Sequence, residues 1–178
     1  SIGMSLFLVT LLYAYIEFQE ELAARSRVYH RVMVTHVEGL TSLLPAAAVD
    51  RIRSVEGVAA AAPLSWFGGL YQDEKIPFAQ FATHARPLLD CWTEYRLAAD
   101  QLAAWEADRT GCVVGRKIAA SKGWKPGDQI VLKGAIYDCD LHLTVRGVYD
   151  GSDTADLHML WFHDAYLDEL LKASRSRM

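Results

Sequence analysis

The sequence predicts an α+β fold, in which short strands and short helices follow one another along the chain. Residues 111–134 have the pattern of a strand, a two-turn helix, a tight turn and a second strand. Residues 28–66 have the pattern of a strand, a helix and a strand, and residues 141–149 form a further long strand. We therefore expect a strand–helix–strand unit with an inserted mixed β-rich lobe.

Composition limits the class of protein. The chain has 178 residues, of which 52% are hydrophobic, enough for one domain with its own core or one domain with an inserted lobe. The net charge of −4 gives no basic face, which argues against a nucleic-acid partner. Cys91, Cys112 and Cys139 lack C-x-x-C spacing and leave at least one thiol unpaired, so this is not a disulfide-rich scaffold.

The first sixteen residues carry no charge, and the run from Met4 to Ile16 is apolar on every helical face. It is shorter than the roughly 20 residues of a membrane-spanning helix, so we interpret it as the outer end of one. The polar residues that follow, up to Arg27, continue this helix into water as a stalk. A buried core helix and an uncleaved signal segment are the alternatives. The predicted membrane residues are Leu6, Phe7, Leu8, Val9, Leu11, Leu12, Tyr13, Tyr15 and Ile16.

Local signals place the elements that precede the centre. Alternation predicts a strand over residues 28–37, and Pro45, which is tolerated in a first turn, begins a helix over 45–55. The pair Glu56-Gly57 ends that helix. The pattern then predicts a strand over 58–66, hairpin strands over 70–72 and 76–83, and helices over 88–95 and 98–107.

The centre of the chain has the clearest signals for where its strands, helix and turn begin and end. The apolar run Cys112-Val113-Val114 lies between two glycines and predicts a buried strand. A helix begins near Arg116, and glycine is the residue that most readily ends one in the left-handed conformation. Proline followed by glycine is typical of a type II turn. The predicted structural turn residues are Gly123, Pro126, Gly127 and Asp128.

The strand after this turn should place Ile130 and Leu132 on its buried side. Three elements complete the chain: a strand over 141–149, a strand over 157–162, and a helix over 165–173 that Asp164 caps.

Three segments carry a family resemblance. Val-Val-Gly-Arg-Lys-Ile-Ala begins at Val113, Gly-Trp-Lys-Pro-Gly-Asp-Gln-Ile-Val-Leu begins at Gly123, and Leu-Thr-Val-Arg-Gly-Val begins at Leu143. In this order they resemble the periplasmic core domain of MacB/FtsX-type ABC-transporter permeases, and Ile52 to Pro63 extends the likeness. The resemblance implies three parts: residues 1–27 as the end of a transmembrane helix and stalk, 28–66 as the first half of a membrane-proximal lobe, and 67–178 as the inserted lobe and the start of the return. A further strand–helix–strand unit would follow in the complete protein.

The resemblance also implies a function. The domain would lie on the periplasmic side of a bacterial inner membrane and would couple ATP hydrolysis by a cytoplasmic ABC ATPase subunit to export, extraction or regulation of a partner. It implies a dimer in the full transporter, and a periplasmic partner protein or a lipophilic cargo. The alternative is a ligand-binding or sensory domain of a receptor, tethered by the N-terminal helix.

We assign no catalytic, cofactor-binding or metal-ligating residue. The histidines lack H-E-x-x-H and H-x-H spacing, and His30 and His36 are six residues apart, roughly 20 Å along a strand. No Gly-Lys-[Ser/Thr] follows Gly115, so a P-loop is absent, as is G-x-S-x-G. Cys112 is interpreted as a buried structural thiol. The sequence therefore predicts a domain that is not an enzyme.

Aromatic residues gather in one stretch of the chain, between the second strand and the fourth. We interpret them as the core face of the predicted hairpin. If exposed, they would instead form an apolar patch for a partner or for lipid. They are Trp66, Phe67, Tyr71, Phe78 and Phe81.

Overall fold

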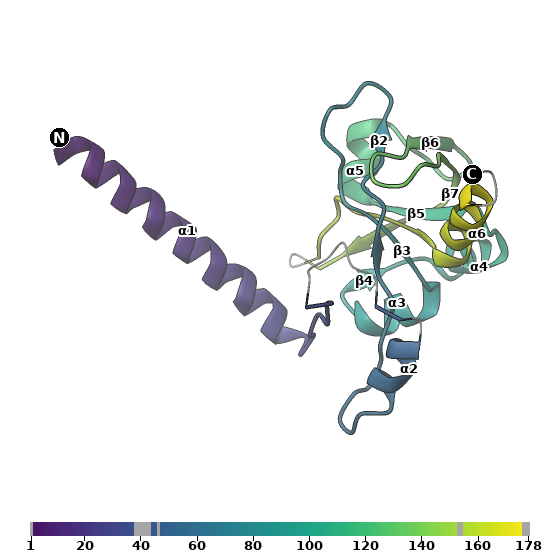
Figure 1. Ribbon diagram of the computed structural model, residues 1–178, viewed down its shortest axis with the longest axis horizontal. Helices are drawn as coiled ribbons and strands as arrows, with labels where there is room; N and C mark the ends of the chain where they lie inside the picture. The colour runs from purple at the N-terminus through teal and green to yellow at the C-terminus, as the bar shows by residue number, and fades with distance from the viewer. Residues whose placement is uncertain (1, 38–43, 46, 153–154, 176–178) are drawn as a thin grey trace. The chain divides into compact units, whose positions relative to one another are not determined.

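The computed structural model describes residues 2–37, 44–45, 47–152 and 155–175. The chain divides into two compact units, Ser1–Val34 and Thr35–Met178. The first unit consists mainly of helix α1 (Ile2–Val28), which Figure 1 shows as one uninterrupted helix. No proline interrupts it, and its only glycine lies in the first turn. At 1.5 Å per residue it is about 40 Å long.

The predicted strand over residues 28–37 is wrong. Val28 still belongs to α1, the chain turns at Tyr29 and His30, and only an isolated bridge at His36 follows. His30 has a positive φ of 49°, which breaks any extended path there. An alternating segment becomes a strand only when a second strand pairs with it. Among the described residues no such ladder forms here, and Val32 remains 82% exposed.

The rest of the predicted strand–helix–strand unit is shorter than expected. Helix α2 (Ala47–Arg53) lies inside the predicted range of 45–55. The predicted strand over 58–66 is reduced to β1 (Ser65–Trp66), because only these residues reach a partner, β3 (Gln80–Thr83). Residues 58–64 contain neither helix nor strand.

The second unit is built on a mixed sheet of eight strands in the described residues, shown in Figure 1. The strand order is β1-β3-β8-β5-β7-β6-β2, and β4 pairs with β7 beside this path. The strands not yet given are β2 (Leu70–Tyr71), β4 (Tyr95–Arg96), β5 (Gly111–Gly115), β6 (Gln129–Lys133), β7 (Leu141–Gly151) and β8 (Leu160–His163).

The pairing of β3 corrects the predicted hairpin. Instead of pairing with residues 70–72, β3 pairs antiparallel with β1 and parallel with β8. Strand β2 pairs with β6 at the far edge of the sheet. Three of the four β3 residues are buried, which suits a strand enclosed by neighbours on both sides rather than one arm of a two-stranded ribbon.

The sheet separates two hydrophobic cores. Along β8, Leu160 and Phe162 belong to one core and Trp161 belongs to the other, because successive side chains point to opposite faces. Helices α5 (Arg116–Lys122) and α6 (Asp164–Arg175) contribute to the first core. Helices α3 (Ala85–Cys91) and α4 (Ala99–Ala107) contribute to the second. The fold is therefore α+β, with helices packed on both faces of a mixed sheet.

One predicted helix ends early, whereas the next agrees with its prediction. The helix expected over 88–95 is α3, which begins at Ala85 and stops at Cys91. Tyr95 lies instead in β4, opposite Gly151 of β7. The helix expected over 98–107 is α4.

The central stretch folds as the positions of its glycines and proline predict. Helix α5 ends at Gly123, which adopts φ 72°. The N–H of Asp128 donates to the carbonyl oxygen of Lys125 at 3.1 Å, which closes a turn with Pro126 and Gly127 at its centre. Gly127 adopts φ 101°, the conformation that the third residue of a type II turn requires. Strand β6 then buries Ile130 and Leu132 and exposes the residues between them.

Candidate functional site

The first half of helix α1, from Met4 to Ile16, presents apolar side chains on all sides. The nine residues predicted to contact a membrane are each between 45% and 66% exposed. They are Leu6, Phe7, Leu8, Val9, Leu11, Leu12, Tyr13, Tyr15 and Ile16. A helix that is apolar all round is stable only when lipid or protein surrounds it. This surface therefore calls for an apolar partner.

The polar side chain of Thr10, within this apolar run, has its hydrogen-bonding need met by the helix itself. Its Oγ1 donates to the carbonyl oxygen of Leu6 at 2.9 Å. An unpaired hydroxyl is costly in an apolar medium, so this bond makes Thr10 compatible with one. Among the described helices, none combines the length and hydropathy required to cross a membrane.

The junction between β5 and α5 depends on a close backbone contact. A Cβ at Gly115 would lie 2.2 Å from the carbonyl oxygen of Leu157. That oxygen accepts the N–H of Ile118 at 3.1 Å, and the N–H of Gly115 itself donates to Met159 at 3.0 Å. The segment before β8 therefore satisfies backbone donors at the start of α5, where a helix has free N–H groups.

A buried glutamine joins β3 to the bend before β2. The Oε1 atom of Gln80 accepts the N–H of Gly69 at 2.8 Å, and its Nε2 donates to the carbonyl oxygen of Gly69 at 2.7 Å. Gln80 is fully buried. The side-chain amide thus pairs with a backbone amide as a neighbouring strand would. Nothing in the sequence around Gln80 distinguishes it from a surface glutamine.

A cluster of polar side chains around the carboxylate of Asp108 links the end of α4 to β7. The side chain of Asp108 accepts bonds from Thr110 N at 3.0 Å, from Thr110 Oγ1 at 2.9 Å, and from Arg146 Nε at 2.7 Å. Partial burial alone would raise the pKa of Asp108. The bonds from Arg146 and Thr110 and the charge of Arg146 outweigh it and hold the pKa below its usual value.

The lowered pKa predicts how the cluster responds to acid. A group whose pKa is lower in the folded than in the unfolded protein stabilises the fold above the unfolded value of about 4, and this contribution is lost as the pH falls through the folded value. At neutral pH, Asp108→Asn should be less stable than the unsubstituted chain, and the difference should shrink below about pH 4. Urea unfolding at pH 7, 5 and 3 measures this. A difference that is independent of pH would contradict the role given to the charge.

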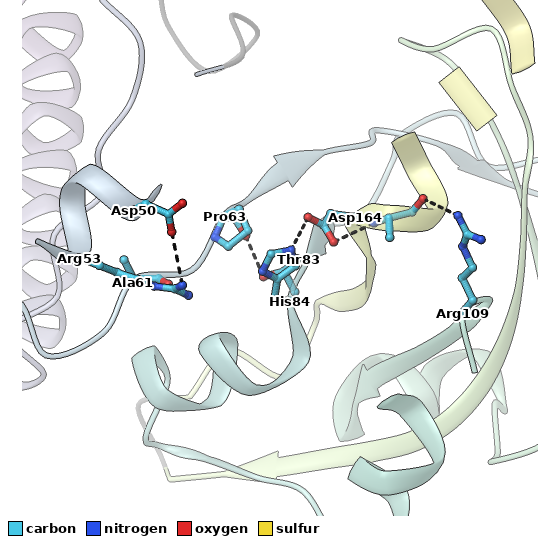
Figure 2. Close-up of polar contacts among 9 residues, drawn as sticks. Asp50, Arg53, Ala61, Pro63, Thr83, His84, Arg109 and Asp164 are labelled. Carbon is cyan, nitrogen blue, oxygen red and sulfur yellow. Dashed lines mark hydrogen bonds and ion pairs between the residues drawn. The ribbon is translucent and has the colours of Figure 1, made fainter. Parts of the chain in front are cut away.

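Polar contacts fasten two segments to the carboxyl end of β3, as Figure 2 shows. Thr83 Oγ1 donates to the carbonyl oxygen of Pro63 at 2.8 Å, so it holds the segment before β1. The next residue, His84, places Nε2 2.7 Å from a carboxylate oxygen of Asp164 in the first turn of α6. Arg109 binds the same helix through Glu169 at 2.8 Å. The contacts of His84 and Arg109 hold α6, and the contact of Thr83 holds the segment before β1. They do not converge on a common centre.

A shallow groove of about 230 Å³ lies beside the segment that Thr83 holds. It is lined by Arg53, Val58, Ala59, Ala60, Ala61, Pro87 and Asp90. The guanidinium group of Arg53, which lines this groove, already has a partner, because its Nη2 donates to the carbonyl oxygen of Ala61 at 2.9 Å.

The histidines and Cys112 remain as residues with potentially reactive side chains. No group of three or more His, Cys, Asp or Glu side chains in the described part of the chain could hold a metal ion. Cys112 is fully buried, and burial raises the pKa of its thiol, which disfavours the reactive thiolate. His163 contacts the carbonyl oxygen of Trp105 at 2.8 Å, and His158 lies 3.4 Å from Asp156. These contacts of His163 and His158 involve different partners.

The aromatic stretch contributes to both cores rather than to one face of a hairpin. Phe67 is fully buried in the first core, against which Tyr71 and Phe78 pack. Phe81 packs against the second core and stacks on Trp161 with ring centroids 5.4 Å apart. Trp66 meets Phe81 edge to face at 5.2 Å. The core interpretation of these residues therefore agrees with the structure, although the single predicted face does not.

Comparison with known proteins found solved structures to which this chain is similar. No family model and no curated protein matches the chain. A domain of a putative permease protein from Porphyromonas gingivalis is similar at a TM-score of 0.45 and 17% identity, over 67% of this chain and 55% of that one. The extracellular domain of the noncanonic ABC-type transporter YknZ from Gram-positive bacteria is similar at a TM-score of 0.49 and 14% identity, over 76% of this chain and 72% of that one. The chain thus spans little more than half of the first of these structures.

Proposed function

We propose that this chain is the extracytoplasmic domain of an ABC-transporter permease of the MacB/FtsX type. One observation carries the proposal. The three sequence segments that resemble this family begin at Val113, Gly123 and Leu143, and they form β5 with α5, the turn with β6, and β7. In the sheet, β7 lies between β5 and β6 and is hydrogen-bonded to both. The residues that carry the resemblance therefore form one contiguous structural unit.

The proposed place of the domain is the periplasmic side of a bacterial inner membrane, with residues 1–27 as the end of a transmembrane helix and stalk. The exposed apolar surface of α1 supports this placement, as do Tyr13 and Tyr15, whose rings favour the level of the lipid headgroups. In the same proposal residues 28–66 begin a membrane-proximal lobe, and residues 67–178 form the inserted lobe.

Vesicle binding tests the membrane contact. The full chain should float with phosphatidylcholine vesicles on a density gradient, whereas a chain lacking residues 1–16 should remain folded and stay with the unbound protein. Leu8→Lys should weaken partitioning about a hundredfold, because a lysine near the centre of an inserted helix costs roughly 3 kcal/mol. Gln19→Lys lies beyond the apolar run and is the matched control, with little effect expected. Equal binding of both variants would exclude insertion of α1.

The proposal assigns ATP hydrolysis to a separate cytoplasmic ABC ATPase subunit, and the domain itself is not an enzyme. Motion driven by that subunit would reach the domain through α1 and lead to export of a lipophilic cargo, to its extraction, or to regulation of a periplasmic partner protein. The full transporter would be a dimer. The continuity of α1 from Ile2 to Val28 supports this route, because a continuous helix transmits displacement along its axis.

Purification of the full-length protein from detergent-solubilised membranes tests the assignment. An ABC ATPase should copurify in stoichiometric amount. Copurification of a kinase or a methyl-accepting protein would favour the alternative, a tethered sensory domain of a receptor.

A variant pair tests the coupling. Glycine at both Gln19 and Glu20 should leave α1 about 2 kcal/mol less stable than alanine at the same two positions. The glycine variant should lower transport per ATP hydrolysed, whereas the alanine variant preserves the helix and should not. Equal transport per ATP in the two variants would exclude α1 as the coupling element, while the copurified ATPase would still identify the permease.

A further inference from the structure

We draw no further inference here: the strongest candidate, the segment of residues 58–64 that continues edge strand β1 beside the groove lined by Arg53, Pro87 and Asp90, has nothing in the structure to show what covers it.

Discussion

Replacing Gly115 with alanine is expected to destabilise the domain by roughly 3–5 kcal/mol, the sum of a steric overlap and a lost buried hydrogen bond. The added Cβ would lie 2.2 Å from the carbonyl oxygen of Leu157 and 2.7 Å from its Cα. Because both are backbone atoms, no side-chain rotation relieves the overlap. The segment before β8 must move, and it would then release the N–H of Ile118. In a thermal melt the midpoint should fall by about 6–20 °C.

Gly123→Ala is the matched control, at the other end of the same helix. Gly115 has an ordinary φ of −68°, so alanine is excluded there by space alone. Gly123 has φ 72°, and no atom lies within 4 Å of the point that a Cβ would occupy, so alanine costs only the left-handed conformation, about 1–2 kcal/mol. If the two variants melt at the same temperature, the contact between Gly115 and Leu157 does not constrain the fold.

Replacing Gln80 with leucine should cost a similar amount, roughly 3–5 kcal/mol, because it leaves two buried backbone groups of Gly69 without a partner. Leucine is close to glutamine in size, although its branch lies one carbon nearer the backbone, so most of the loss comes from the missing hydrogen bonds rather than from a cavity. Chemical denaturation at neutral pH measures it. A stability equal to that of the unsubstituted protein would mean that water replaces the amide.

Gln80→Glu separates hydrogen bonding from packing. A protonated carboxyl group can accept from one amide and donate to the other, as the glutamine does, whereas a carboxylate cannot donate. Burial raises the pKa of a carboxyl group, so this variant should lose stability as the pH rises above the unfolded value of about 4.3. Relative to the unsubstituted chain it should be less stable at pH 8 than at pH 5. A loss of stability that is the same at pH 8 and at pH 5 would contradict the hydrogen-bonding role of this side chain.

Local chemistry was sufficient to predict the centre of the chain. Pro126 restricts its own φ, and Gly123 and Gly127 permit the positive φ that other residues avoid, whatever surrounds them. The two-residue spacing of Ile130 and Leu132 between the polar ends Gln129 and Lys133 likewise marks the buried side of β6 without knowledge of its partner. The helices α4 and α6 and the strand β7 follow from similar local patterns, and so does the uninterrupted helix of α1.

Strand pairing was not predictable in this way, because a strand depends on a partner that is distant in sequence. Residues 28–37 alternate as well as any strand in the chain, yet no ladder forms there among the described residues. Residues 76–83 looked like one arm of a hairpin with 70–72, whereas β3 pairs with β1 and β8. Similar local patterns therefore led to different structures, depending on whether the edge of another strand was available for pairing.

The sequence by itself thus determined the α+β class, the backbone of the central motif and the apolar character of α1, since each depends on residues close together in the chain. The tertiary structure decided the strand order and the contacts that hold the motif in place. Gly115 is required because Leu157 passes against it, 42 residues later in the sequence, and Gln80 matters because Gly69 faces it. Such contacts leave no local signal, because their energy depends on where two distant backbone segments meet.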